Sequence, residues 1–238
     1  MTKPFDSLIP SIEQRESAWI QLKERQALRP ETSRRPTITL SREFGCEAFP
    51  MAERLKARLE KATGESWNIY DKALVEKVAA DEQLSLDLLS HLGDESHARD
   101  VLRTHFGYLT HDEAYAKVVK HLVQVAPLGN AIIVGRGGAV VCQDMPHCLH
   151  LRLEGGFTFR VATLARRLGV PERDAEDMVR TQSKLREKFI SDCLHTDITL
   201  PLWYHAVLNN ERLDAEALAR IAFELLKTTW SEPELFKD

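Results

Sequence analysis

The sequence contains few cysteines, glycines, prolines and aromatic residues. Its 238 residues include 4 Cys, 11 Gly and 10 Pro, and aromatic side chains make up 7% of the chain. Four cysteines are too few for a disulfide framework, and no two of them have the C-x-x-C spacing that binds zinc or exchanges disulfides. The low glycine and proline content argues against a fibrous or disordered chain. A reducing, cytoplasmic location is the simplest expectation.

Long apolar runs and a strong excess of one charge are also missing. The longest apolar stretch, 131–142, is interrupted by Arg136 and three glycines, and the N-terminus has no apolar segment typical of a signal peptide. The 32 basic and 36 acidic residues give a net charge of −4. We therefore expect neither a membrane span nor a general attraction to nucleic acid.

The overall composition is that of a globular protein, with 43% hydrophobic and 29% charged residues. The length fits one medium-sized α/β domain with appendages. Residues 1–36 predict a helix followed by a linker rich in helix breakers, an arm that packs on the main domain or contacts a partner or a second copy of the chain. Residues 37–228 are expected to form the main domain, and residues 229–238 a tail.

Short β-branched or apolar runs alternate with helical patterns from residue 37 onward. Strands are predicted at 37–41, 67–70, 131–134, 147–153 and 204–208. Helices are predicted around 51–59, throughout 71–126, in the basic region 157–192 and from Asp214 onward. This alternation predicts a parallel sheet covered by helices on both faces, a three-layer α/β fold.

Two loops follow predicted strands at the edge where parallel sheets bind ligands. The first joins the 37–41 strand to the next helix and contains Gly45. The second, Gly135-Arg136-Gly137-Gly138, allows close backbone approach and offers a guanidinium group to a phosphate, although its glycines can equally be structural. The first loop lacks G-x-x-x-x-G-K-[ST], so the usual phosphate-loop lysine and magnesium-binding hydroxyl are missing.

Basic residues are concentrated in the segment 159–188, which holds eight bases and five acids. One interpretation is a solvated helix surface with i, i+4 ion pairs. The other is a lid whose arginines neutralise phosphate oxygens during phosphoryl transfer.

Four segments in order resemble the landmarks of the cytidylate-kinase-like family. They are Ile38–Gly45, Tyr70–Val75, Ile132–Gly137 and Leu208–Leu213. The resemblance covers nearly everything except the N-terminal arm and implies a P-loop kinase of the nucleoside monophosphate type. It implies a helical acceptor-binding region at 71–126 and an arginine-rich lid at 157–192. It also implies small-molecule nucleotides as ligands, with ATP and Mg²⁺ as donor and a CMP-like nucleotide or similar small molecule as acceptor.

The resemblance also implies roles for individual residues. The donor phosphates would be held, largely through backbone amides, by Ser41, Arg42, Gly45, Cys46, Glu47 and Ala48. The acceptor would be bound by Asp71, Lys72 and Arg136, and Asp71 is also a candidate magnesium ligand. The transferred charge would be stabilised by the catalytic arginines Arg136, Arg160, Arg167 and Arg186.

The sequence departs from the family pattern at two places. The usual Ser-Gly-Gly after Gly45 is replaced by a run that includes Glu47, whose carboxylate would repel a triphosphate if the charges were close and unscreened. Ser183 stands three residues before Arg186, where an aspartate is usual. These departures leave a second function open: a catalytically degenerate module that senses a nucleotide or anion, or binds a partner.

Other sites are less well supported by the residues. Cys142, Cys148, His147 and His150 suggest a metal site, but on a strand the two histidines point to opposite faces, so one site cannot easily use both. A dinucleotide site at 135–138 is disfavoured because Val140 stands at its last glycine position. Neither G-x-S-x-G nor H-E-x-x-H occurs, which disfavours the common hydrolases and zinc proteases.

Overall fold

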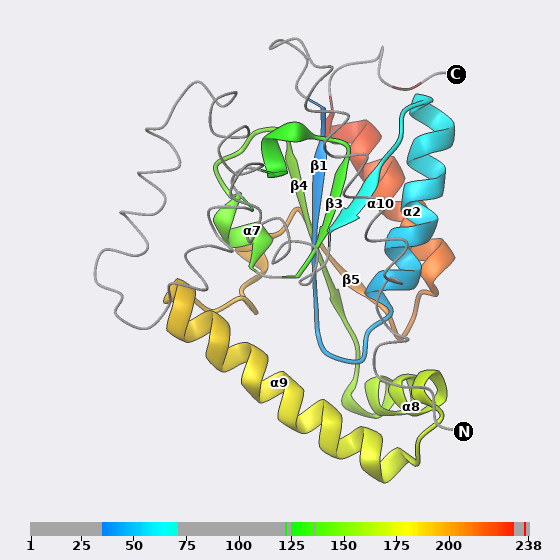
Figure 1. Ribbon diagram of the computed structural model, residues 1–238, viewed down its shortest axis with the longest axis vertical. Helices are drawn as coiled ribbons and strands as arrows, with labels where there is room; N and C mark the ends of the chain where they lie inside the picture. The colour runs from blue at the N-terminus through cyan, green and yellow to red at the C-terminus, as the bar shows by residue number, and fades with distance from the viewer. Residues whose placement is uncertain (1–34, 71–121, 123–124, 136, 231–235, 237–238) are drawn as a thin grey trace, which may run out of the picture.

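The computed structural model describes residues 35–70, 122, 125–135, 137–230 and 236. Five parallel strands form one sheet in the order β2-β3-β1-β4-β5. The strands are β1 (Thr37–Arg42), β2 (Asn68–Tyr70), β3 (Ala131–Val134), β4 (Cys148–Glu154) and β5 (Ala206–Asn209). Helices cover both faces of this sheet (Figure 1), so the predicted three-layer α/β architecture is confirmed.

The strands form where short apolar or β-branched runs occur in the sequence. Strand β1 is central, and its residues 37–41 are buried, as expected for a strand covered on both faces. β3 coincides with the predicted strand. β5 begins at Ala206 and not at 204, because the Tyr204 amide donates to the Pro201 carbonyl at 3.0 Å and closes the 3-10 turn η3 (Pro201–Trp203).

One face of the sheet is apolar and packs against α2 (Ala48–Thr63) and α10 (Ala215–Thr229), which lie side by side (Figure 1). Residues Met51, Leu55 and Leu59 recur at helical spacing along α2 and are fully buried in this core. Gly64 ends α2 in the left-handed conformation with φ +69°. The side chain of Asp214 begins α10 by accepting a hydrogen bond from the amide of Ala217 at 2.8 Å, as predicted from its N-cap position.

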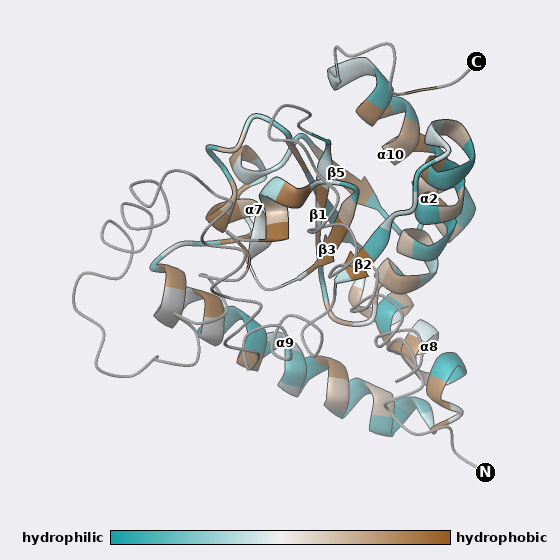
Figure 2. Ribbon diagram, turned by 45° about the horizontal axis from the view of Figure 1, so that its top comes forward, coloured by the Kyte–Doolittle hydropathy of each residue, from teal (hydrophilic) through white to brown (hydrophobic). Residues whose placement is uncertain are grey.

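The other face of the sheet is unusually polar and is covered in part by the short helix α7 (Gly138–Val141). Thr39, Ser41, His150 and Arg152 alternate along β1 and β4 and are buried. The Thr39 hydroxyl is hydrogen-bonded to His150 Nδ1 at 2.8 Å, which compensates both groups for the loss of water. Figure 2 shows hydrophobic colour concentrated along the central strands and more hydrophilic residues on the surrounding helices.

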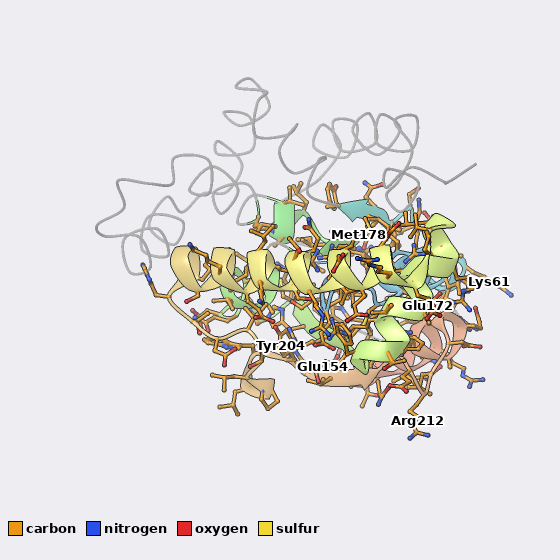
Figure 3. The ribbon with its side chains drawn as sticks, turned by 90° about the horizontal axis from the view of Figure 1, so that it is seen from below. Lys61, Glu154, Glu172, Met178, Tyr204 and Arg212 are labelled. Atoms are coloured by element: carbon orange, nitrogen blue, oxygen red, sulfur yellow. The ribbon has the colours of Figure 1, made fainter. Side chains whose placement is uncertain are left out.

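Helices α8 (Phe157–Leu168) and α9 (Glu172–Leu194) lie beyond the carboxyl ends of the strands (Figure 1). The predicted helical region 157–192 is thus confirmed as two helices, separated by Gly169 and Pro171. Viewed from this end, α9 runs across the molecule, while Lys61 and Arg212 extend outward at its periphery (Figure 3). Phe44, from the loop after β1, is buried in the apolar cluster between α8 and α9.

Some predicted segments lie outside the described residues. These are the N-terminal arm up to residue 34, positions 71–121, 123–124 and 136, and most of the C-terminal tail. Within the described ranges, no helix is long and apolar enough to cross a membrane.

Candidate functional site

The candidate site lies where the chain changes direction across the sheet. The segment after β1 leads through α2 to β2 on one side, whereas the segment after β3 passes α7 and continues to β4 on the other side of β1. In open parallel sheets, such a reversal opens a crevice at the carboxyl ends of the strands, where ligands bind. A cavity of about 340 Å³ lies there. Its size falls within the usual range for small-molecule sites.

Two arginines from distant segments line this cavity, Arg42 at the end of β1 and Arg186 on α9. Arg186 Nη1 donates to the main-chain carbonyl of Arg42 at 3.3 Å, and its guanidinium carbon lies 5.5 Å from the centre of the Phe44 ring. The described lining residues include no carboxylate. The charged groups of the described lining are thus two guanidiniums, which suit an anion.

Gly135 is needed for Arg42 to reach this position. The glycine has a φ of +86°, in the left-handed region, and a Cβ atom there would overlap the Arg42 guanidinium. Glycine is thus required at position 135 for two reasons: it adopts the left-handed conformation, and its lack of a side chain leaves room for the Arg42 guanidinium. Gly137, the other neighbour of Arg136, also lines the cavity, although Arg136 itself lies outside the described residues.

The remaining lining residues make the cavity amphipathic. Ser41 and Gln182 contribute polar groups. The apolar residues of the lining are Val134, Leu185, Ile190 and Ile198. An apolar wall beside two guanidinium groups fits a molecule that carries both a flat, weakly polar part and a strongly anionic part, as a nucleotide does.

The loop between β1 and α2 is held by contacts within the protein. Gly45 has a φ of +101°, and a Cβ there would lie 2.7 Å from the Cβ of Arg160. The amide of Cys46 donates to the Glu43 carbonyl at 3.3 Å, and the amide of Glu47 donates to the side-chain oxygen of Asn210 at 2.7 Å. Of the predicted phosphate-binding amides, those of Cys46 and Glu47 therefore already have protein acceptors.

The Glu47 carboxylate, expected to repel a phosphate, has basic neighbours from α8. Arg166 Nη2 lies 3.4 Å from Glu47 Oε1. Burial lowers the pKa of Arg167, and the charge of Glu47 opposes this effect. The negative charge of Glu47 is thus partly neutralised by two arginines of the predicted lid.

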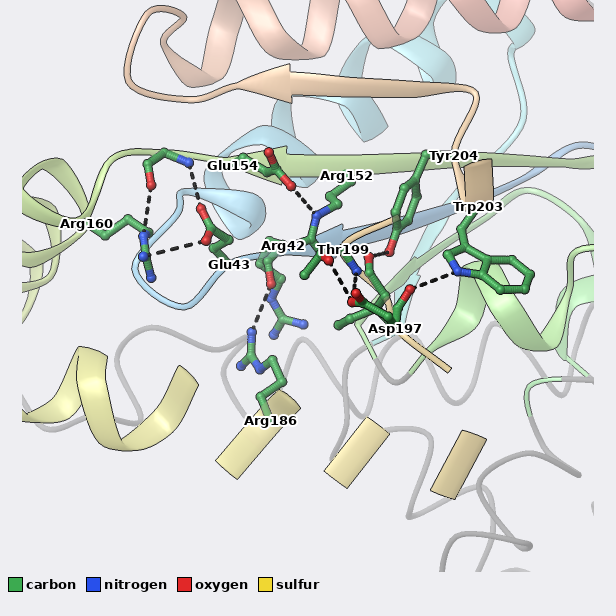
Figure 4. A network of polar contacts seen from close by, with 12 residues as sticks. Arg42, Glu43, Arg152, Glu154, Arg160, Arg186, Asp197, Thr199, Trp203 and Tyr204 are labelled. Carbon is green, nitrogen blue, oxygen red and sulfur yellow. Dashed lines mark hydrogen bonds and ion pairs between the residues drawn. The ribbon is translucent and has the colours of Figure 1, made fainter. Parts of the chain in front are cut away.

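Arg160 and Glu43 form the centre of a polar cluster (Figure 4), here called the Arg160 clasp and defined by Glu43, Phe44, Gly155, Arg160 and Ser183. Arg160 Nη2 lies 3.6 Å from Glu43 Oε1, and Arg160 Nε donates to the Gly155 carbonyl at 2.9 Å. Arg160 Nη1 donates to the Phe44 carbonyl at 3.2 Å and to the Ser183 hydroxyl at 3.4 Å. The Gly155 amide donates to Glu43 Oε2 at 2.9 Å. The clasp ties the loop to β4, α8 and α9.

Arg152 is a buried charge of this region that the sequence analysis did not single out. It lies opposite Ser41 in the β1–β4 pairing and is 4% exposed. Its Nε donates to Glu154 Oε1 at 2.6 Å, and its guanidinium carbon lies 5.7 Å from the centre of the Tyr204 ring (Figure 4). Its position in the sequence could have indicated this, because Arg152 is a charged residue within the mostly apolar strand segment Leu149–Leu153.

Cys46 is a poor candidate for a nucleophile. Burial, followed by the charge of Glu43, raises the pKa of its thiol to about 12. Because the thiolate is the reactive form of cysteine, this side chain is inert near neutral pH.

The predicted site residues thus lie at different places in the structure. Ser41, Arg42 and Arg186 line the cavity, whereas residues 45–48 form the adjoining loop and the start of α2. Arg160 lies in the clasp, and Arg167 lies near Glu47. Asp71, Lys72 and Arg136 lie outside the described residues.

The histidines considered as metal ligands are engaged in separate contacts. His147 Nε2 lies 3.2 Å from the Ala126 carbonyl in the 3-10 turn η2 (Ala126–Leu128), whereas His150 Nδ1 bonds to Thr39. Across the part of the chain that the structure describes, no three acidic, histidine or cysteine side chains are grouped to hold a metal.

The sheet order, the loop that leads from β1 into α2 and the cationic cavity beside it define a nucleotide-kinase-like α/β fold of the P-loop type. The model of the cytidylate kinase-like family matches residues 37–212. The chain belongs to the cytidylate kinase-like family.

Among solved structures, the fold is similar to that of an uncharacterized protein from Eubacterium ventriosum ATCC 27560. The TM-score is 0.65 at 18% sequence identity, and the match covers 82% of this chain and 99% of the other. At this identity the similarity supports the fold alone. The comparison with curated proteins finds no match.

Proposed function

We propose that the chain binds ATP and transfers its terminal phosphoryl group to a nucleoside monophosphate, with a CMP-like nucleotide as the first candidate, or to a similar small acceptor. The observation that carries the proposal is that Arg42 and Arg186 line one cavity of about 340 Å³ at the carboxyl ends of β1 and β3. Phosphoryl transfer depends mainly on positioning and neutralising phosphate oxygens, and guanidinium groups do both.

Each segment around the cavity has a role in the proposed reaction. Arg42 and the loop after β1 hold the donor phosphates. Arg136, between two glycines that line the cavity, holds the acceptor phosphate, with Asp71 and Lys72 on the acceptor side. Arg186 neutralises charge on the transferred group, and its place on α9 allows the helix to exclude water as it closes.

Mg²⁺ is expected to accompany ATP. The described lining residues supply oxygen ligands from Ser41 and Gln182 but no carboxylate. This set suits an ion held chiefly by the triphosphate and water, as Mg²⁺ commonly is. Mg²⁺ would neutralise charge on the phosphates, and Asp71 is the candidate protein ligand.

A second candidate function is supported by the loop itself. Asn210 already accepts the amide hydrogen of Glu47, and the Glu47 carboxylate lies in the region where a phosphate loop binds its ligand. These contacts favour a module that binds a nucleotide or anion weakly, without turnover, and signals to a partner.

Calorimetric titration with ATP and with CMP, each with and without Mg²⁺, tests the proposal together with a coupled assay of ADP release. We expect Arg186→Gln to weaken ATP binding about tenfold or more, because it removes a charged hydrogen-bond donor. Arg180→Gln on the same helix is the control, since the Arg180 side chain is 60% exposed and pairs with Glu176.

The outcomes separate the two functions. ADP release that is lost in Arg136→Ala supports the kinase. Binding of ATP without ADP release supports the sensor and contradicts phosphoryl transfer. Absence of binding by either nucleotide contradicts the kinase and the nucleotide sensor.

A further inference from the structure

A second cavity lies where the chain enters β4 and β5, and it shares no described lining residue with the cavity at the carboxyl ends of the strands. Its volume is about 440 Å³, within the usual range for small-molecule sites. One wall comes from the segment 200–205, which precedes β5, and another from Gln143 and Asp144, which precede β4. His150 of β4 also lines it. The proposed phosphoryl transfer uses none of these residues.

Two aromatic rings, those of Trp203 and Tyr204, line this second cavity and are held in place through their own polar atoms. Trp203 Nε1 donates to the Asp197 carbonyl at 3.0 Å, and the Tyr204 hydroxyl donates to the Ile198 carbonyl at 2.8 Å (Figure 4). Because these polar atoms already have partners, the rings offer a ligand chiefly their carbon surfaces. Preformed aromatic surfaces favour flat ligands that stack on them.

Two leucines beside these rings have large exposed apolar surfaces. Leu202 is 92% exposed and Leu200 is 44% exposed, and both line the second cavity. Apolar surface that is removed from water contributes favourable free energy to binding. A ligand with an apolar face would therefore be held by the leucines as well as by the rings.

The imidazole groups of the second cavity make part of its lining polar. His150 is 4% exposed, and its Nδ1 is hydrogen-bonded to the Thr39 hydroxyl. Its Nε2, on the other side of the ring, is buried and has no hydrogen-bond partner of ordinary geometry among the described residues. The His150 amide donates to His205 Nδ1 at 3.0 Å, so His205 Nε2 carries the ring hydrogen and is a donor. A heterocycle whose edge both donates and accepts matches two such nitrogens.

The charge of the second cavity differs from that of the first. Its described lining includes the carboxylate of Asp144 and no lysine or arginine. Burial, and then the charge of His205, lower the pKa of His150 to about 4, so this ring is neutral near pH 7. A phosphate group would therefore find no guanidinium here, in contrast to the cavity that Arg42 and Arg186 line.

We propose that the second cavity binds an uncharged, planar heteroaromatic molecule, such as a nucleoside without a phosphate, against the rings of Trp203 and Tyr204 and the imidazole of His150. This inference does not depend on the proposed function, because different residues line the two cavities. The rings and leucines supply stacking and apolar contact, the imidazoles pair with the edge of the heterocycle, and Asp144 disfavours an anion.

Adenosine, AMP and D-ribose are the probes, because they differ in the groups that the cavity is inferred to select. Methyl nuclear magnetic resonance of the full-length protein follows Leu200 and Leu202 in the second cavity and Leu185 in the first. We expect adenosine to shift the signals of Leu200 and Leu202 in a saturable manner. D-ribose, which lacks the heterocycle, should leave them unchanged. AMP should bind about tenfold more weakly there, because its phosphate faces Asp144.

Two variants test the binding surface. Trp203→Ala is expected to weaken adenosine binding, followed at Leu200, about tenfold, since it removes a stacking surface. Leu202→Ala should weaken it about threefold, and its exposed position keeps the test valid if Trp203→Ala does not fold. Leu185→Ala is the matched control, because Leu185 is also exposed but lines the first cavity, and it should leave the adenosine response of Leu200 unchanged.

Three results would overturn the proposal. The first is that adenosine leaves Leu200 and Leu202 unshifted, whether or not Leu185 responds. The second is that D-ribose or AMP shifts these two leucines at the same concentration as adenosine does. The third is that adenosine binds folded Trp203→Ala or Leu202→Ala as tightly as it binds the wild type.

Discussion

The amide of Glu47 and the side-chain oxygen of Asn210 are 2.7 Å apart, although 163 positions separate the two residues in the sequence. Asn210 is 2% exposed, and its Nδ2 also donates to the Leu213 carbonyl at 3.2 Å. One side chain thus joins the loop after β1 to the loop after β5, and the ends of both strands depend on it.

Asn210→Ala is expected to lower the free energy of unfolding by about 1–3 kcal/mol, because it leaves a partly buried amide and a carbonyl without their partners. Urea denaturation followed by circular dichroism measures this loss. Glu211→Gln is the matched control: Glu211 Oε2 accepts from the Gly156 amide at an exposed position, and glutamine keeps an oxygen there. Equal losses in the two variants would contradict the structural role of Asn210.

Gly135→Ala should weaken ATP binding in addition to lowering the free energy of unfolding. The added Cβ meets the far end of the flexible Arg42 side chain, which can move aside but then leaves its place in the cavity. Gly169→Ala is the control, because Gly169 has a similar φ of +69° but nothing within 4 Å of the added Cβ. Both variants should lose about 1–2 kcal/mol of stability from left-handed strain. Calorimetry should find weaker ATP binding only in Gly135→Ala, and unchanged affinity there would contradict the role of Arg42.

The ion pair between Glu43 and Arg160 should contribute more to stability than an exposed pair does. A double-mutant cycle with Glu43→Gln and Arg160→Met is expected to give a coupling energy above about 1 kcal/mol, because the Arg160 side chain is 11% exposed and holds several further contacts. The exposed pair Glu176–Arg180 is the reference and should couple by about 0.3–0.5 kcal/mol. A coupling energy no larger than that of the reference pair would contradict the proposed contribution of the Glu43–Arg160 pair to stability.

His150 should make stability depend on pH below neutrality. Burial, and then the nearby His205, lower its pKa from 6.5 to about 4, against a hydrogen bond to the Cys142 backbone. Between these two values the unfolded chain binds the proton more readily than the folded protein does. The stabilising effect of the neutral ring is therefore present above pH 6.5 and is lost as the pH falls toward about 4.

His150→Asn removes this titration and keeps an oxygen acceptor near the Thr39 hydroxyl. Urea denaturation at a series of pH values should give a shallower decline for the variant than for the wild type, by no more than about 1.4 kcal/mol per pH unit. Parallel declines would contradict the role of His150 in the acid sensitivity.

The architecture could be predicted from the sequence because it depends on local patterns. The apolar run 131–134 and the β-branched run from Thr37 to Ser41 form strands as expected, and Asp214 begins a helix where its side chain can cap one. The family resemblance is confirmed over most of the main domain. Strand ends were less predictable, because turns such as η3 depend on local backbone hydrogen bonds that leave little trace in composition.

The contacts at the site could not be predicted in the same way. Arg42 and Arg186, to which the resemblance gives different roles, line the same cavity. No local pattern indicates that Glu43 pairs with Arg160 or that Asn210 accepts from Glu47. Each of these contacts joins segments more than a hundred residues apart, so only the assembled sheet brings them together. The catalytic roles assigned to Arg160 and Arg167 stay predictions.

Helix α10, the last helix that the structure describes, lies directly against α2, the first. During synthesis, α2 leaves the ribosome well before the residues of α10 exist, and its apolar side then has no covering helix. The native core therefore cannot close around a nascent chain until Leu218 and Leu226 have emerged. A chain that ends before Leu218 therefore leaves the side of α2 that α10 covers without its native partner helix.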